Sequence, residues 1–96
     1  MDENEESVLA AEALIGDDAE AFIRSELGRT ILGIAKQEAQ SAMEQLKSAS
    51  AADQDKIRAL QNEIWRAEQF EDWLLELIDR GAQAIKIVQH EADTHE

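Results

Sequence analysis

The sequence predicts an all-α protein, built as a long antiparallel helical hairpin with a short N-terminal helix and dimerising into a helical bundle. The 96 residues include no proline and only four glycines. Ala, Glu, Leu, Gln and Lys dominate, as they do in long helices and coiled coils. Apolar residues recur at helical spacing along two long stretches. A chain this short buries a modest fraction of its surface, so partners often complete its core.

The N-terminal segment is the most acidic part of the chain. Residues 1–20 carry eight Asp or Glu and no Lys or Arg, a local charge of -8 within a total of -13. Residues 1–6 have no periodic apolar set, which predicts an acidic disordered arm. Such an arm either keeps the protein soluble or contacts a basic partner surface.

A single helical domain is predicted over residues 7–90, beginning with two helices that meet at a glycine. Ser7 is suited to cap a short helix over residues 7–15, which Gly16 would end. Asp17 would cap a long helix over residues 18–48, with acidic residues in its first turn.

A reversal is predicted at residues 49–53, where Ser50 and Asp53 resemble a capping box. The third helix, residues 53–89, carries a heptad seam of apolar residues and is followed by a polar tail, residues 91–96. Contacting positions in the hairpin should sum to about 102 because the turn centres near residue 51. The predicted intrachain seam consists of Ile23, Leu27, Ile31, Ile34, Leu46, Ile57, Leu60, Ile64, Leu74, Ile78 and Ile85.

Glu71 and Gly81 interrupt the apolar seam of the third helix. Glu71 falls on the seam, and a buried carboxylate is costly unless it is paired, so Thr30, Arg24, Arg29 or Lys36 should satisfy it. Gly28 and Gly33 weaken the second helix, and close packing is the expected compensation.

A second apolar stripe runs beside the seam of the third helix, at Phe70, Trp73, Leu77 and Ala84. One partner helix cannot cover both stripes. Either the short helix folds back over the second stripe, or two hairpins associate into a four-helix bundle. We expect both, with Phe70, Trp73, Leu77 and Ala84 as the partner interface of a homo-oligomer.

No catalytic, cofactor or metal site is predicted. Cysteine is absent, the four glycines are isolated, and His90 and His95 stand five residues apart, whereas the zinc motif H-E-x-x-H needs four. Neither histidine follows a glutamate by three residues, as in di-iron bundles. Direct nucleic-acid binding requires a clustered positive face, and a membrane span requires about 20 apolar residues. The sequence has neither. We therefore expect a protein that is not an enzyme and binds neither nucleic acid nor membrane.

Two stretches, "AFIRSELGRTILGIAKQEAQSAMEQL" and "IRALQNEIWRAEQFEDWLLELIDRGAQA", resemble small helical-hairpin proteins of tailed bacteriophages. The similarity lies in an Arg-flanked glycine, the "IRALQ" opening and a "W-L-x-x-x-I" pattern, over about residues 20–85. It implies a phage context, in the cytoplasm of a bacterial host or in the virion, with another phage or host protein as partner.

The predicted function is therefore non-enzymatic helical oligomerisation, in a bacteriophage virion accessory or structural component that acts through protein–protein contacts. The alternative is an acidic inhibitor or DNA mimic, whose carboxylates would stand in for phosphates on the basic surface of a host nucleic-acid-binding protein.

Overall fold

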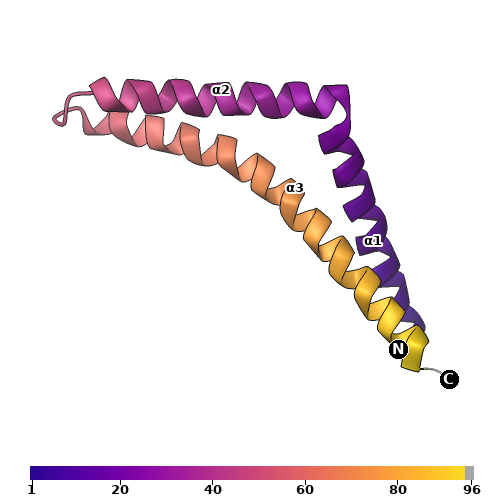
Figure 1. Ribbon diagram of the computed structural model, residues 1–96. Coiled ribbons are helices and arrows are strands. Elements are labelled where there is room, and N and C mark those ends of the chain that lie inside the picture. Colours follow the sequence, from indigo (N-terminus) through magenta and orange to yellow (C-terminus); the bar gives the residue numbers. More distant parts are fainter. Residues whose placement is uncertain (95–96) are drawn as a thin grey trace. The chain divides into compact units, whose positions relative to one another are not determined.

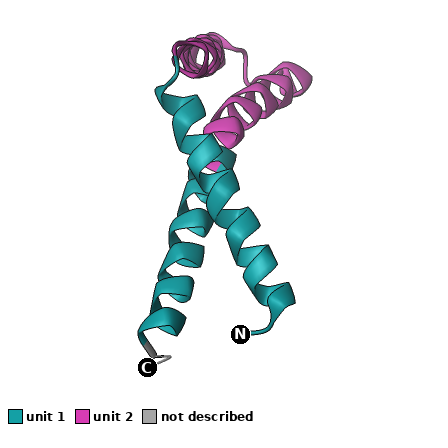
Figure 2. Cartoon of the chain, turned by 90° about the vertical axis from the view of Figure 1, so that its right-hand side faces the viewer, with its two compact units in different colours: residues 1–25, 73–96 teal, residues 26–72 magenta. Residues whose placement is uncertain are grey.

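The computed structural model describes residues 1–94, which form three helices and no strand (Figure 1). They are α1 (Glu3–Arg24), α2 (Glu26–Ser48) and α3 (Gln54–Thr94). Together they hold 86 of the 94 described residues, which confirms the all-α class. The chain divides into two compact units (Figure 2). Unit 1 comprises residues 1–25 and 73–96, and unit 2 comprises residues 26–72, so that α3 contributes to both.

Helix α1 begins four residues earlier than predicted. Asp2 is its N-cap, since the Glu5 backbone N–H donates to Asp2 Oδ1 over 2.7 Å. Acidic residues fill the first turn, where the helix dipole favours them. The prediction of a disordered arm over residues 1–6 is therefore wrong for residues 3–6, and Ser7 lies inside the helix rather than at its cap.

The break between the first two helices falls at Ser25 instead of Gly16. Helix α1 continues through Gly16 and ends at Arg24, and the backbone of its C-cap, Ser25, is extended at ψ 157°. The Ser25 hydroxyl donates to the carbonyl of Phe22 over 2.6 Å. A basic residue, Arg24, precedes this break and an acidic one, Glu26, follows it, as the two helix dipoles favour. The predicted helices over residues 7–15 and 18–48 thus have the wrong boundary.

The predicted turn at residues 49–53 is confirmed, because α2 ends at Ser48 and α3 begins at Gln54. The Asp53 N–H donates to the Ser50 carbonyl over 3.0 Å, and Asp53 Oδ1 in turn accepts from the N–H of Lys56 over 3.3 Å. Helix α3 runs to Thr94, past the predicted end at residue 89. The predicted polar tail is helical as far as residue 94, and residues 95–96 lie outside the described range.

Unit 2 is an antiparallel pair formed by α2 and the first part of α3 (Figure 1). Its buried apolar residues are Ala39, Ala42 and Leu60. Ala35 and Ala67 line the same groove between the helices, which agrees with contacting positions that sum to about 102. The predicted hairpin register therefore describes this unit.

Unit 1 pairs α1 with the last part of α3, and the two helices cross where two glycines meet (Figure 2). A Cβ added to Gly16 would lie 2.9 Å from Gly81 Cα and 3.0 Å from the carbonyl oxygen of Leu77. No described residue has a positive φ, so these glycines are needed for their size and not for an unusual backbone conformation. The backbones approach as closely as they do because neither position carries a side chain.

Candidate interaction surfaces

Most large apolar side chains of the described chain are not buried. The buried apolar residues are Ala19, Ala39, Ala42, Leu60 and Ala84. The exposed large apolar residues are Val8, Leu14, Ile15, Leu27, Ile34, Met43, Trp65, Trp73, Leu75, Ile85, Ile87 and Val88. Contiguous exposed apolar groups mark interaction surfaces in soluble proteins, so the grooves beside these residues are the candidate sites.

The first candidate, which we call the hairpin groove, lies in unit 2 and has a volume of about 460 Å³. Its lining residues are Ile31, Ile34, Ala35, Glu38, Glu63, Arg66, Ala67 and Phe70. Ile34 is 51% exposed and Phe70 is half-buried. The hairpin groove therefore has an apolar floor with two carboxylates and one guanidinium among its lining groups.

Glu71 was predicted to be a buried carboxylate with a partner. Its carboxylate lies 4.0 Å from Lys36 Nζ, one of the partners expected from the sequence, but the residue is half-buried rather than buried. Thr30 takes a different role, because its hydroxyl donates to the Glu26 carbonyl over 2.8 Å. Partial solvation explains how a carboxylate is tolerated at a seam position.

The second candidate, the α1/α3 groove, lies in unit 1 and has a volume of about 390 Å³. Its lining residues are Met1, Asn4, Glu5, Val8, Leu9, Ile87 and Glu91. Val8 and Ile87 are exposed, and Glu91 lies 3.8 Å from the ammonium of Met1. This groove has acidic side chains and no basic side chain among its lining residues.

The four residues of the predicted partner interface lie in different surroundings. Ala84 is 1% exposed and lies one turn after Gly81, so α1 covers it. Leu77 is half-buried, with its carbonyl against Gly16. Phe70 lies in the hairpin groove, and only Trp73 is largely exposed. The assignment of Ala84 to a partner interface is wrong because α1 packs against that side of α3.

The predicted seam is partly covered. Leu60 is buried, and the half-buried members are Ile23, Ile31, Leu46, Ile57, Ile64, Leu74 and Ile78. Leu27, Ile34 and Ile85 are exposed, contrary to the prediction. Leu27 is in the first turn of α2, and Ile85 lies beyond the glycine crossing, where the buried positions of α3 change.

The two predicted close-packing glycines have different surroundings. Gly28 is buried, as a close-packing role requires. Gly33 is exposed and a Cβ there would meet nothing within 4 Å, so the prediction of close packing at Gly33 is wrong. Of the two glycines at the helix crossing, Gly16 was predicted to end a helix, and Gly81 was predicted only to interrupt the apolar seam of the third helix. The spacing of small residues at Gly16 and Ala19, and at Gly81 and Ala84, was the available signal for that crossing.

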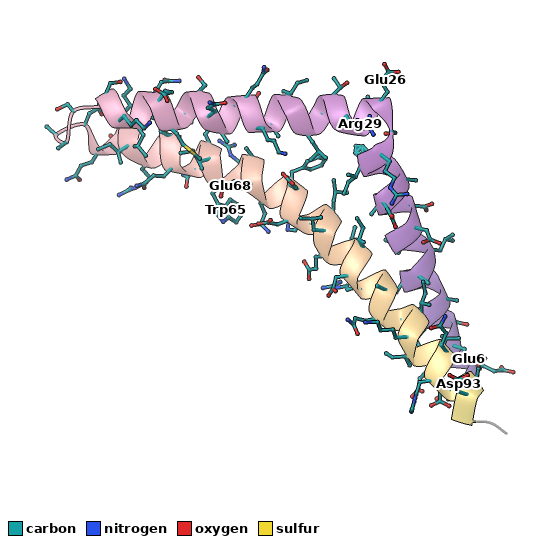
Figure 3. All side chains as sticks on the ribbon, in the orientation of Figure 1. Glu6, Glu26, Arg29, Trp65, Glu68 and Asp93 are labelled. Carbon is teal, nitrogen blue, oxygen red and sulfur yellow. The ribbon has the colours of Figure 1, made fainter. Side chains whose placement is uncertain are left out.

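Trp65 was also missed as a surface residue. It is exposed, near Asn62 and Arg66, and projects from α3 on the side away from α2 (Figure 3). Glu68 projects from the same part of the helix. The signal in the sequence was that Trp65 falls beside the heptad seam among polar residues.

Charge is distributed unequally between the units. Unit 1 contains 13 acidic and 3 basic residues, a net charge of -10, whereas unit 2 contains 9 acidic and 6 basic residues, a net charge of -3. The two grooves therefore lie in different electrostatic surroundings, although both have apolar floors.

Residues 1–94 contain no candidate metal site and no candidate membrane-spanning helix. Among residues 1–94 no group of three or more His, Cys, Asp or Glu could hold a metal ion, and His95 lies outside that range. Over the same residues, no helix has both the length and the apolar character that crossing a membrane requires. Comparison with protein-family models, curated proteins and solved structures finds no match. The phage context stays a prediction from the sequence.

Proposed function

We propose that this chain is a non-enzymatic helical assembly protein that self-associates through the hairpin groove of unit 2. The observation that carries the proposal is the exposed side chain of Ile34, beside half-buried Phe70. Residues 26–72 supply only two helices, so nothing within this unit covers their common apolar face. A second copy placed on that face makes a four-helix bundle, in which all four helices bury an apolar stripe.

The charges of the hairpin groove suit an identical partner. In a two-fold interface the same patch meets itself, so a basic group on one copy can face an acidic group on the other. Arg66 provides the positive charge, and Glu38 and Glu63 provide the negative charges. Because unit 2 has a net charge of only -3, repulsion between two copies is small there.

The proposal also assigns a biological role. In the bacteriophage setting that the sequence resemblance implies, the dimer is a virion accessory or structural component. Self-association would present two copies of unit 1 to another protein. Avidity would then strengthen a contact that is weak for a single copy.

Substitution of Ile34 tests the proposal. Light scattering at tens of micromolar should give a dimer of about 21 kDa for the native chain, twice the 10.7 kDa of one copy. Ile34→Lys should give a helical monomer, because it replaces an apolar side chain of the interface by a charged one that is costly to remove from water.

Met43→Lys is the matched control, since Met43 is exposed and lies nine residues, or two and a half helical turns, after Ile34. It is therefore on the opposite side of α2. The substitution should leave the dimer intact. A native chain that scatters as a monomer, or an Ile34→Lys variant that stays dimeric, would contradict the proposal.

A further inference from the structure

We infer that the α1/α3 groove of unit 1 is a docking site for a basic amphipathic helix of another protein. The inference does not rest on self-association through unit 2, because different residues carry it. It rests on the apolar floor of the groove, the charge of its lining side chains and the charge of the unit around it.

The apolar floor is open because of how the two helices meet. They touch at Gly16 and Gly81 and diverge from that point (Figure 2). Val8 lies about two turns before Gly16, and Ile87 about two turns after Gly81. Beyond the crossing, Val8 and Ile87 line a groove between the two diverging helices, and Met1 and Glu91, which also line it, form an ion pair of 3.8 Å.

The apolar face extends along α1 beyond the groove. Ile15 follows Val8 by seven residues, and both side chains are exposed. Residues seven apart lie on nearly the same face of a helix, about 20° from each other. A ligand that contacts Val8 can therefore continue along α1 if its own apolar residues repeat at helical spacing.

The charged side chains that line this floor are acidic, and the Met1 ammonium, which also lines it, lies 3.8 Å from the carboxylate of Glu91. Glu5 and Glu91 line the groove, and Glu6 and Asp93 lie at the same end of unit 1 (Figure 3). Two of the three basic side chains in unit 1 are already paired. Arg24 lies 2.5 Å from a carboxylate oxygen of Glu20, and Arg80 lies 2.7 Å from one of Glu76. The acidic charge of -10 is thus little offset within the unit.

These properties select among possible occupants. A second copy of unit 1 would bring another charge of -10, and like charges facing each other across an interface disfavour binding. Nucleic-acid phosphates are repelled for the same reason. A basic helix with an apolar stripe matches both the floor and the charge, and it would add a third helix to a two-helix pair. A DNA mimic would need the carboxylates but not the exposed Val8 and Ile87.

The probe is a fluorescently labelled peptide of 18 residues made of Leu and Lys, with Leu at positions i, i+3, i+4 and i+7. Its control has the same composition, scrambled so that the leucines share no face. Anisotropy titration should show that the patterned peptide binds the native chain at least about tenfold more tightly than the scrambled one. Both affinities should fall between about 50 mM and about 500 mM salt, because screening weakens the attraction to the acidic unit.

Variants locate the site. Val8→Ser with Ile87→Ser should weaken binding of the patterned peptide about tenfold, because it removes the two exposed apolar side chains of the floor while leaving every charge in place. Leu14→Ser with Leu75→Ser is the matched control, since it removes two exposed apolar side chains from the same helices but outside the groove. The control should bind like the native chain, and circular dichroism should show equal helicity in both double variants.

Three results would overturn the inference. Equal binding of the scrambled peptide would mean that charge alone attracts the probe. An unchanged affinity in the Val8→Ser, Ile87→Ser variant, or an equal loss in both double variants, would place the contact elsewhere. Ile34→Lys should bind the patterned peptide with unchanged single-site affinity, so a failure of self-association and a failure of this site can be told apart.

Discussion

The two units hold their helices together by different means. In unit 2, α2 and α3 pack through Ala39, Ala42 and Leu60, in a hairpin whose register follows from its turn. In unit 1, α1 and α3 make a backbone crossing at Gly16 and Gly81, where a single methyl group would be in conflict. Unit 2 thus depends on a side chain that fills space, whereas unit 1 depends on side chains that are absent.

The same helix serves both arrangements by changing its buried positions. In unit 2 the heptad members of α3 include Leu60 and Ile64. Continuing that repeat past Leu74 would bury Ile85, yet Ile85 is 40% exposed and Ala84 is 1% exposed. The covered face moves because the partner changes from α2 to α1. A regular heptad can therefore predict the wrong face once a second partner helix takes over.

The largest expected loss of stability follows a substitution in unit 2. Leu60 is 5% exposed and is the largest side chain in its core, so Leu60→Ala should lower the free energy of unfolding by about 2–5 kcal/mol through cavity formation. Urea denaturation followed by circular dichroism at a fixed protein concentration measures the change. Leu27→Ala is the control because Leu27 is 66% exposed, and it should cost well under about 1 kcal/mol. Similar losses in the two variants would show that Leu60 is not the core residue described.

A smaller loss of stability should follow a substitution at the helix crossing of unit 1. Gly16→Ala should destabilise the crossing by about 1–3 kcal/mol, because the added Cβ would meet backbone atoms that cannot rotate away. Hydrogen exchange should speed up at the amides of α1, while those of α2 near Ala39 and Ala42 keep their protection. Uniform loss of protection in both helices would mean that the two units do not open separately. Protection in α1 equal to that of the native chain would mean that the close approach is absent in solution.

The smallest expected change is a gain of stability, at Gly33. Gly33→Ala adds a methyl group to a helical position with nothing within 4 Å, so it should stabilise the chain by about 0.5–1 kcal/mol through helix propensity. Thermal unfolding compared with that of Gly16→Ala measures the contrast between an open glycine and a packed one. A destabilised Gly33→Ala variant would indicate a neighbour, such as a second chain, at that position.

The features that were predictable from the sequence depend on local rules. The helical class follows from composition, and the turn after Ser48 follows from the polar residues around Ser50 and Asp53. The pairing near Leu60 follows from the heptad and from the position of that turn. Each of these inferences requires only residues that are close in the chain.

The features that were not predictable depend on the partner of each helix. A glycine such as Gly16 is equally consistent with a helix end and with a close crossing, and only the facing Gly81 distinguishes them. The break at Ser25 contains neither Gly nor Pro, and its charge signal, Arg24 before and Glu26 after, is weak. The first helix was expected to fold back over the second stripe, but which residue of the stripe it would cover depends on where α1 crosses α3, and Ala84 lies one turn from that crossing.

The Gly16–Gly81 crossing also bears on the order of folding. It joins positions 65 residues apart, whereas Glu38 and Glu63, which line one groove, are 25 apart. Loop-closure entropy grows with the logarithm of length, so the longer closure costs only about 0.8 kcal/mol more. In the unfolded chain, Gly16 and Gly81 meet less often than the two helices of the hairpin. Once the hairpin has formed, less flexible chain separates Gly16 from Gly81. We expect unit 2 to nucleate folding and α1 to dock afterwards, an order that hydrogen-exchange labelling during refolding can follow.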